Sequence, residues 1–317
     1  MTIERTMTNK LHISPSRLWR LLIFALPLAA CTSEVTDEAL QGGALPIAFR
    51  VPEVTKAVKE SFISGDAFSV WGGYNGATSV FNNETVTYNG TAWTYTGGNR
   101  YWTFGNSYDF YAVYPTGVGS CDTQGTITVR DFDCSKGVDL MTAEETGISY
   151  KEGDPTEAVS FTFRHELARV NIVVQVDPQV SVTDLSATLS GYTSSGTLTR
   201  PKSGDASWVT TGTSNFNKGG IDIPENTSYD LFGDLLLIPQ STEGITLTLN
   251  LTRDGSPVKY TAHFDESITA WSAGQPYRYV LHIKVDAITF SNFTADEWGE
   301  THTGGDINIG GGTNQGN

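Results

Sequence analysis

Cysteine is scarce in this sequence, with only Cys31, Cys121 and Cys134 present. A disulfide-dense scaffold is therefore excluded, because such folds need several cysteine pairs. Cys121 and Cys134 flank the short segment Thr126–Arg130 and could bridge a hairpin in an oxidising compartment. Such a bridge would add about 3 kcal/mol to the free energy of unfolding. The alternative is two unpaired thiols, and metal ligation is disfavoured because no histidine or second cysteine pair lies nearby.

Basic residues are also few, with 20 Lys and Arg against 35 Asp and Glu. Residues 1–30 hold four of the basic residues and one acidic residue, so the chain from residue 31 onward carries 16 basic and 34 acidic residues and a net charge of −18. A surface this acidic repels phosphate backbones, so we expect no nucleic-acid partner. The same charge suits an exported protein that must stay soluble.

Catalytic motifs are absent from the sequence. The histidines after residue 30 show no HExxH-type spacing: His165, His263, His282 and His302. The segment Gly191–Gly196 lacks the Gly-x-Ser-x-Gly pattern of a nucleophile elbow. Sequence order does not exclude a Ser/His/Asp triad or a carboxylate pair, but no residues mark one out. Asp131–Asp139 is interpreted as an acidic hairpin turn, since its glycine falls one place late for an EF-hand. We expect no enzyme, cofactor or metal site.

Long apolar runs are missing apart from Leu21–Ala30, which follows Arg17 and Arg20 and leads directly into Cys31. A basic start, an apolar middle and small final residues are typical of a secretory signal. The run is shorter than the roughly 20 residues needed to span a bilayer. Its Leu-Ala-Ala-Cys ending resembles the lipobox of bacterial lipoproteins, which are cut before a cysteine that carries diacylglycerol. We predict a signal peptide over 1–30 and lipid on Cys31. The alternative is an uncleaved anchor, or an ordinary signal with a chance cysteine.

Beyond a small, polar tether over residues 31–44, the chain alternates apolar and polar residues between turn signals, which is the period of half-buried strands. Asn-Gly and Asp-Gly pairs at positions 75, 89 and 254 mark hairpins. One short helix is predicted near Val54–Glu60. The predicted strands are Leu45–Val51, Ala67–Gly72, Thr85–Tyr88, Tyr108–Tyr114, Gly125–Arg130, Val159–His165, Arg169–Val176, Val182–Ser190, Leu231–Ile238, Ile245–Arg253, Val258–Phe264 and Tyr277–Val285. This pattern favours an all-β fold of sandwiches.

Aromatic residues concentrate before residue 115, and the chain becomes more aliphatic after residue 165. We therefore place an N-terminal sandwich over 45–160, a C-terminal sandwich over 161–300 and a Gly- and Asn-rich tail over 301–317. Trp93 and Trp102 could form a sugar-stacking platform. The alternative is that these aromatics are core residues, because Tyr108–Tyr114 alternates so that one row faces the core while the other packs on a neighbouring strand.

Several segments occur in an order that resembles the fimbrillin family of gut and oral Gram-negative anaerobes. The resemblance spans about Ile47 to Trp298, and it rests on the segments Gly65–Val70, Tyr108–Pro115, Asp139–Ala143, Phe161–Val170, Leu237–Gln240 and Trp271–Leu281. It implies two β-sandwich domains of Greek-key, transthyretin-like topology. It also implies transport to the outer membrane as a lipoprotein, and removal of the N-terminal strand by an arginine-specific protease. A strand from another subunit then fills the groove to build a type V pilus.

Arg50 is the first basic residue after Cys31, and it lies inside the first predicted strand. Cleavage there would free the lipid and expose unpaired main-chain groups, which a donor strand could refill. The alternative is an uncleaved, solvated arginine. Candidate donor residues are Ile288 and Phe290, and, more weakly, Ile307 and Ile309, because two Ile side chains contribute roughly 4–5 kcal/mol at most.

Two functions remain open from the sequence. The first is a structural or adhesive pilus subunit whose partners are other subunits, the outer membrane through lipid, and host or bacterial surface receptors. The second is a surface glycan-binding lipoprotein that uses the aromatic residues of the first domain. The Gly- and Asn-rich end departs from a polymerising stalk subunit, which leaves stalk, tip and anchor roles open.

Overall fold

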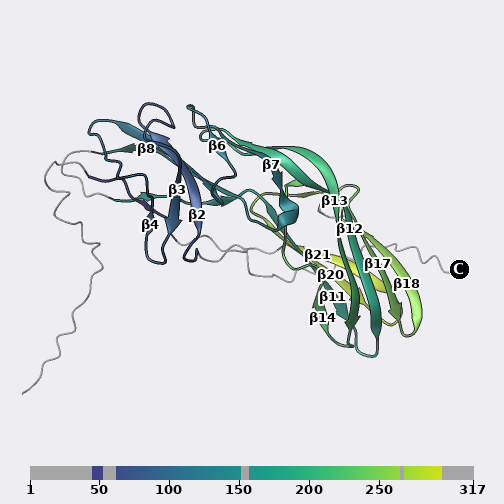
Figure 1. Ribbon diagram of the computed structural model, residues 1–317. Coiled ribbons are helices and arrows are strands. Elements are labelled where there is room, and N and C mark those ends of the chain that lie inside the picture. Colours follow the sequence, from purple (N-terminus) through teal and green to yellow (C-terminus); the bar gives the residue numbers. More distant parts are fainter. Residues whose placement is uncertain (1–44, 53–61, 151–156, 265–267, 295–317) are drawn as a thin grey trace, which may run out of the picture. The chain divides into compact units, whose positions relative to one another are not determined.

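The computed structural model describes residues 45–52, 62–150, 157–264 and 268–294 (Figure 1). These residues form β-strands joined by turns, together with the short 3-10 turn η2 (Cys134–Lys136), which confirms the all-β fold. Several predictions lie outside the described residues: the signal peptide, lipid on Cys31, the tether, the helix near Val54–Glu60, the donor residues Ile307 and Ile309, and the tail.

The first sheet has eight strands in the order β10-β8-β5-β2-β3-β4-β1-β9. Their bounds are β1 (Phe49–Arg50), β2 (Ala67–Gly73), β3 (Phe81–Tyr88), β4 (Trp93–Thr94), β5 (Ser107–Tyr114), β8 (Met141–Ser149), β9 (Val159–Ser160) and β10 (Arg164–His165). β9 and β10 lie at opposite ends of this order, yet only residues 161–163 separate them in sequence. The sheet must therefore curl until its two ends meet, which encloses a core within its inner face.

That inner core is dominated by aromatic rings, and the outer face of the same strands is buried as well. On β2, Val70 points into the enclosed core, whereas Trp71 joins the core of the second domain. On β5, Phe110 likewise belongs to the enclosed core and Tyr111 to the core of the second domain. Alternate residues of a strand point to opposite faces, so a continuous aromatic run fits strands buried on both faces. This confirms the interpretation of the 108–114 segment as two packed rows.

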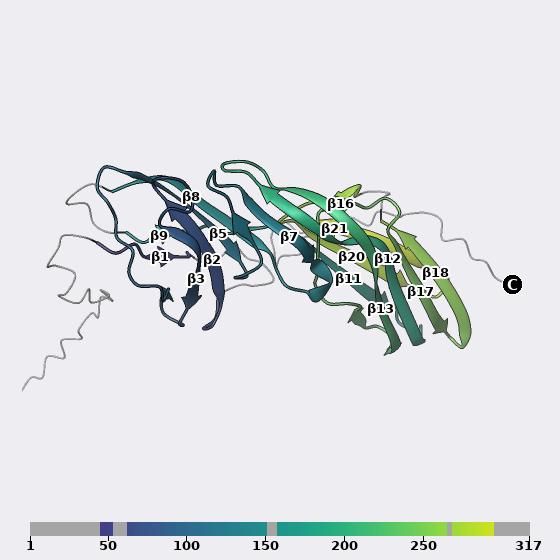
Figure 2. The ribbon, with the colours of Figure 1, turned by 45° about the horizontal axis from the view of Figure 1, so that its top comes forward.

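The second domain is a sandwich with one shared hydrophobic core (Figure 2). One sheet contains β11 (Ala168–Val176), β14 (Ser228–Asp230), β15 (Leu235–Leu237), β20 (Pro276–Ile283) and β21 (Ile288–Thr294), with β11 parallel to β20. The other contains β6 (Ser120–Cys121), β7 (Ile127–Asp133), β12 (Val182–Arg200), β13 (Ser207–Ile223), β17 (Thr246–Arg253) and β18 (Ser256–His263). A small ladder joins β16 (Gln240–Ser241) to β19 (Ala270–Trp271). The Greek-key topology stays a prediction.

Two segments connect the first domain to the second. β7, which precedes the predicted boundary near residue 160, pairs with the second half of β12. The turn between β12 and β13 also reaches the first domain, where the Lys202 ammonium pairs with the Asp109 carboxylate and the Ser203 N–H donates to the Glu144 carboxylate at 2.9 Å. β7 therefore belongs to a sheet of the second domain although it precedes residue 160, and the contacts of the β12–β13 turn join that sheet to the first domain.

The β12–β13 hairpin is much longer than the sequence predicts, because β12 continues ten residues beyond Ser190. Gly191 interrupts the pattern with a φ of +87°, and the register with β13 shifts at that point, as in a β-bulge. A glycine at a bulge looks like a turn in the sequence, which explains the missed extension. The predicted hairpin turn at Asp254–Gly255 is confirmed, since both residues have positive φ between β17 and β18.

Candidate functional site

The first strand is inserted between two neighbours rather than lying at an edge. β1 pairs antiparallel with β4 and parallel with β9. The segment just before it pairs with residues 100–102: the Ile47 N–H donates to the Arg100 carbonyl at 2.7 Å, and the Leu45 carbonyl accepts from the Trp102 N–H at 3.0 Å. The Arg50 carbonyl accepts from the Phe161 N–H at 3.0 Å. Removing residues 45–50 would leave main-chain donors and acceptors unpaired on both sides of one slot.

The side chains of this segment fill the core of the first domain. Ile47 and Phe49 are 1% and 4% exposed. Phe49 contacts the rings of Phe68, Phe81, Tyr95, Phe110 and Phe161. Each fully buried side chain of this size contributes roughly 1.5–3 kcal/mol through removal of apolar surface from water. The slot that the segment occupies is therefore both hydrogen-bonding and apolar.

Arg50 points away from that core. Its side chain is 59% exposed and lies 3.8 Å from the Glu157 carboxylate, itself 78% exposed. An ion pair this open is worth at most about 1 kcal/mol. Arg50 is thus a side chain that solvent reaches, on a strand whose backbone is bonded on both sides.

A buried polar cluster lies where β8 and the end of β12 approach each other, and no motif in the sequence predicts it. Glu166 is fully buried and accepts hydrogen bonds from Arg200 Nε at 3.0 Å and from an Arg200 terminal nitrogen at 2.7 Å. Thr142 donates its hydroxyl to the same carboxylate. Close to them in sequence, His165 Nδ1 lies 2.8 Å from the Asp139 carboxylate, and both residues are buried. The residues come from separate sequence segments, so no spacing rule could group them.

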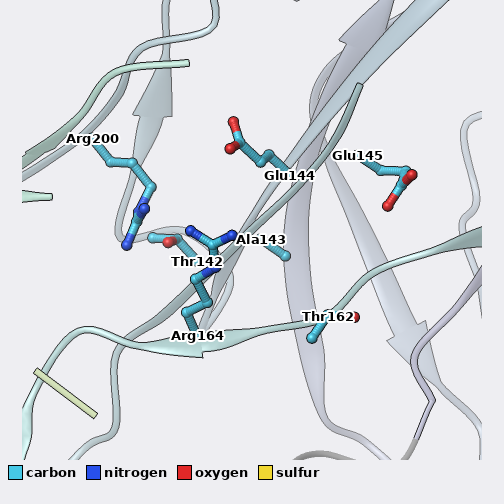
Figure 3. Close-up of a pocket in the computed structure, with 7 residues that line it drawn as sticks. All are labelled: Thr142, Ala143, Glu144, Glu145, Thr162, Arg164 and Arg200. Carbon is cyan, nitrogen blue, oxygen red and sulfur yellow. The ribbon is translucent and has the colours of Figure 1, made fainter. Parts of the chain in front are cut away.

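A pocket of about 210 Å³ opens beside this cluster (Figure 3). Its lining comes from β8 residues Thr142–Glu145 and from Thr162, Arg164 and Arg200. In Figure 3 the guanidinium groups of Arg164 and Arg200 lie beside Thr142. Arg200, which lines this pocket, is already paired with Glu166. Its guanidinium therefore has a structural role and is not a free reactive group. Among the described residues, no group of three or more His, Cys, Asp or Glu side chains is placed to hold a metal ion.

Sequence comparison with protein families finds one model, described as fimbrillin-like, that matches residues 55–298. The chain belongs to the fimbrillin-like family. A comparison with curated proteins found no match. No helix among the described residues has the length and apolar character to cross a membrane.

Solved structures share the fold of this fimbrillin-like chain. A candidate cell adhesion protein from Bacteroides uniformis aligns with 22% identity and a TM-score of 0.55, covering 81% of this chain and 99% of its own. One from Bacteroides ovatus aligns with 16% identity and a TM-score of 0.57, covering 83% and 99%. A fimbrial protein from Bacteroides vulgatus aligns with 19% identity and a TM-score of 0.50, covering 80% and 99%. At these identities the likeness concerns the fold.

Two of the predicted donor residues of this fimbrillin-like chain, Ile288 and Phe290, lie among the described residues, and both are on β21. Within the part of the chain that the structure describes, that strand pairs with β20 alone and forms an edge of its sheet. Phe290 is 1% exposed and packs on Tyr279 and Phe264 at centroid distances of 5.3 Å and 5.2 Å. Ile288 is half-buried against the same core. To serve as a donor, β21 would have to leave its own sandwich.

The two tryptophans considered for sugar contacts are packed against other rings. Trp102 is 6% exposed and lies between Tyr108 and Tyr150. Trp93 is half-buried, with Phe68 at 4.8 Å and further rings around it. Neither indole offers an open face of the kind that stacks on a sugar ring, so the arrangement favours the alternative that they are core residues.

The sequence left two alternatives for Cys121 and Cys134, a bridge or two unpaired thiols, and in the structure both cysteines are free. Cys121 pairs with Ile127 at one end of β7, and Cys134 follows the other end of that strand. A seven-residue strand spans about 20 Å, whereas a disulfide needs Cα atoms within roughly 7 Å. Burial raises the pKa of the Cys121 thiol to about 12 and that of Cys134 to about 11, so neither is a reactive thiolate.

Proposed function

We propose that this chain is a structural and adhesive pilus subunit of the cell surface, assembled by exchange of its first strand. In this proposal Cys31 carries lipid that delivers the subunit to the outer membrane. An arginine-specific protease then cuts after Arg50, and a strand from another subunit enters the vacated slot. The partners are other subunits and, at the surface, receptors on host or bacterial cells. The relatives described as fimbrial and cell adhesion proteins support a surface role.

The observation that carries this proposal is the position of β1 between β4 and β9, with Phe49 in the aromatic core. Loss of an edge strand would expose one row of main-chain groups, whereas loss of an inserted segment exposes two rows and an apolar cavity. Main-chain pairing gives a donor strand its affinity, and side-chain pockets give it specificity. The slot offers both.

The sequence of β21 supports a donor of matching chemistry. Ile47-Ala-Phe49 places an isoleucine and a phenylalanine two residues apart, so that both face the core. Ile288-Thr-Phe290 repeats that pair at the same spacing, and Ile307-Asn-Ile309 offers two isoleucines. Strand register depends on this period of two, so an incoming strand with the same spacing can seat both side chains.

The test compares wild type with Arg50→Ala in cells that supply an arginine-specific protease. We expect wild type to form multimers that resist SDS, while Arg50→Ala stays monomeric and membrane-bound. The uncut segment is held at high effective concentration, so an external strand cannot readily displace it. Arg164→Ala, which removes another exposed arginine, is the matched control and should assemble like wild type. Assembly of Arg50→Ala at the wild-type level would overturn strand exchange at this site.

Lipid attachment is tested separately. Cys31→Ala should abolish incorporation of labelled palmitate and release the chain from the membrane fraction. Because that variant keeps Arg50 and β1, its fold and its sensitivity to the protease should match wild type. Unchanged label in the variant would contradict lipidation at Cys31 without bearing on strand exchange.

A further inference from the structure

The outer edge of β13 is the longest strand edge without a partner among the described residues. β12 has β17 and β7 along one side and β13 along the other, so β13 borders the sheet over residues 207–223 (Figures 1 and 2). A strand border presents a row of main-chain donors and acceptors that can pair with a further strand. Natural proteins usually block such rows with charge, proline or bulges.

This border carries none of those blocks over Ser207–Lys218. The stretch contains no proline, and Lys218 at its end is its only charged residue. Its pairing with β12 places no extra residue on the β13 side of the ladder, so the stretch has no bulge of its own. Val209, near its start, is 71% exposed. By contrast, β18 at another border of the same sheet carries Pro257 and Lys259.

Charge identifies the partner that suits this border. From Leu185 to Ile221 the only acidic residue is Asp205, although the whole chain holds 35 acidic residues among 317. Two copies of a chain with a net charge of −15 repel each other over most of their surfaces. The β12–β13 hairpin has almost no acidic side chains, so the repulsion between two copies is weakest there. Two of its basic residues, Arg200 and Lys202, are already paired with Glu166 and Asp109 of the same chain, so the border faces its counterpart in a second copy as a nearly neutral strand.

We propose that β13 pairs edge to edge and antiparallel with β13 of a second copy of this chain. The contact would join the two sheets into one across a two-fold axis that passes through Ser207–Lys218. It uses neither the β1 slot nor Arg50, so it associates subunits side by side and does not depend on strand exchange. Exposed Thr and Val side chains of the two copies would form cross-strand pairs on the outer face.

Single-cysteine cross-linking on cells that produce the full chain tests this pairing. Val209, Thr211, Thr213 and Asn215 are exposed and alternate along β13, so each is replaced by cysteine in turn and treated with a short bismaleimide. In antiparallel pairing about a two-fold axis, the position nearest the axis lies closest to the same position in the second copy. We expect a dimer band that peaks at one or two adjacent positions and falls at least fivefold at the others. The chain without an added cysteine and Asn250→Cys, exposed on the central strand β17, should give only background.

A charge variant provides the second measurement. Thr211→Lys with Thr213→Lys places facing positive charges on the border, and it should reduce the cross-linked dimer at Val209→Cys or Asn215→Cys at least tenfold. Asn250→Lys adds the same kind of charge to the same sheet away from the border, and should leave the dimer unchanged. Equal cross-linking at β13 and at Asn250, or a product whose mass shows a different protein in place of a second copy, would overturn self-pairing.

Discussion

The ring of Phe49 stacks on the ring of Phe161, with 5.7 Å between centroids and 9° between planes. Phe49 belongs to the first strand, whereas Phe161 lies in the three-residue connection that joins β9 to β10. The Phe161 N–H also donates to the Arg50 carbonyl. One residue therefore holds the first strand through both its side chain and its backbone, at the place where the curled sheet closes.

Phe49→Ala should destabilise the first domain by about 3–5 kcal/mol, because it removes a ring that contacts several others and leaves a cavity. The measurement is equilibrium denaturation in urea. Phe104→Ala is the matched control, since Phe104 is 44% exposed, and it should cost less than about 1 kcal/mol. Equal losses for the two variants would contradict the packing of Phe49.

Arg200→Ala should cost about 3–5 kcal/mol, because it leaves the buried Glu166 carboxylate without its charged partner. The double variant Glu166→Met, Arg200→Met should be more stable than Arg200→Ala, since no buried charge remains unpaired. Arg50→Ala breaks an exposed ion pair and should change stability by at most about 1 kcal/mol. If the double variant is less stable than Arg200→Ala, the pair is not electrostatically coupled in this way.

Ile172→Ala should lower the free energy of unfolding by about 2–5 kcal/mol, because Ile172 is fully buried on β11, between β20 and the strands β14 and β15. Thermal unfolding followed by circular dichroism measures the shift. Ile63→Ala makes the same chemical change at a position that is 66% exposed, and its midpoint should stay near that of wild type. A shift within error for Ile172→Ala would place that face in solvent.

Cys121 and Cys134 should be found as separate thiols. Arg130 lies between them, so trypsin places them in different peptides and a bridge would appear as a linked pair. Burial raises both pKa values above the usual 9.0, so the thiols stay protonated at pH 8 and alkylate slowly in the folded chain. Alkylation should accelerate in urea, and more modestly as the pH rises toward 11. A linked peptide pair from non-reduced protein would contradict the structure.

The sequence predicted most strands because apolar residues alternate along them, as in Ala168–Val176 and Thr246–Arg253. It missed β13, whose residues are mostly exposed, so that Ser207–Lys218 shows little apolar alternation. Pairing with β12 fixes that strand, and pairing partners are not visible in a local pattern. The sequence left the cysteine bridge open for a related reason, since the cysteines flank a strand and the sequence does not show that the strand is extended between them.

The candidate site divides in the same way. Arg50 could be named from the sequence because it is the first basic residue after Cys31, and its exposed position on β1 agrees with access from solvent. The insertion of β1 between β4 and β9 could not be predicted from the sequence, because it depends on residues 100–102 and 159–161 meeting across the curled sheet. The Glu166–Arg200 pair was missed because its partners are far apart in sequence and neither belongs to a motif.

N-terminal sequencing of the surface-exposed form tests strand exchange most directly. The form is isolated from cells that carry an arginine-specific protease, and its first residues are read by mass spectrometry and Edman degradation. The account predicts a chain that begins at Val51, with residues 45–50 and their lipid removed. A blocked, lipidated start at Cys31 on subunits recovered from assembled pili would contradict it, because the slot between β4 and β9 would still be filled by the subunit's own strand.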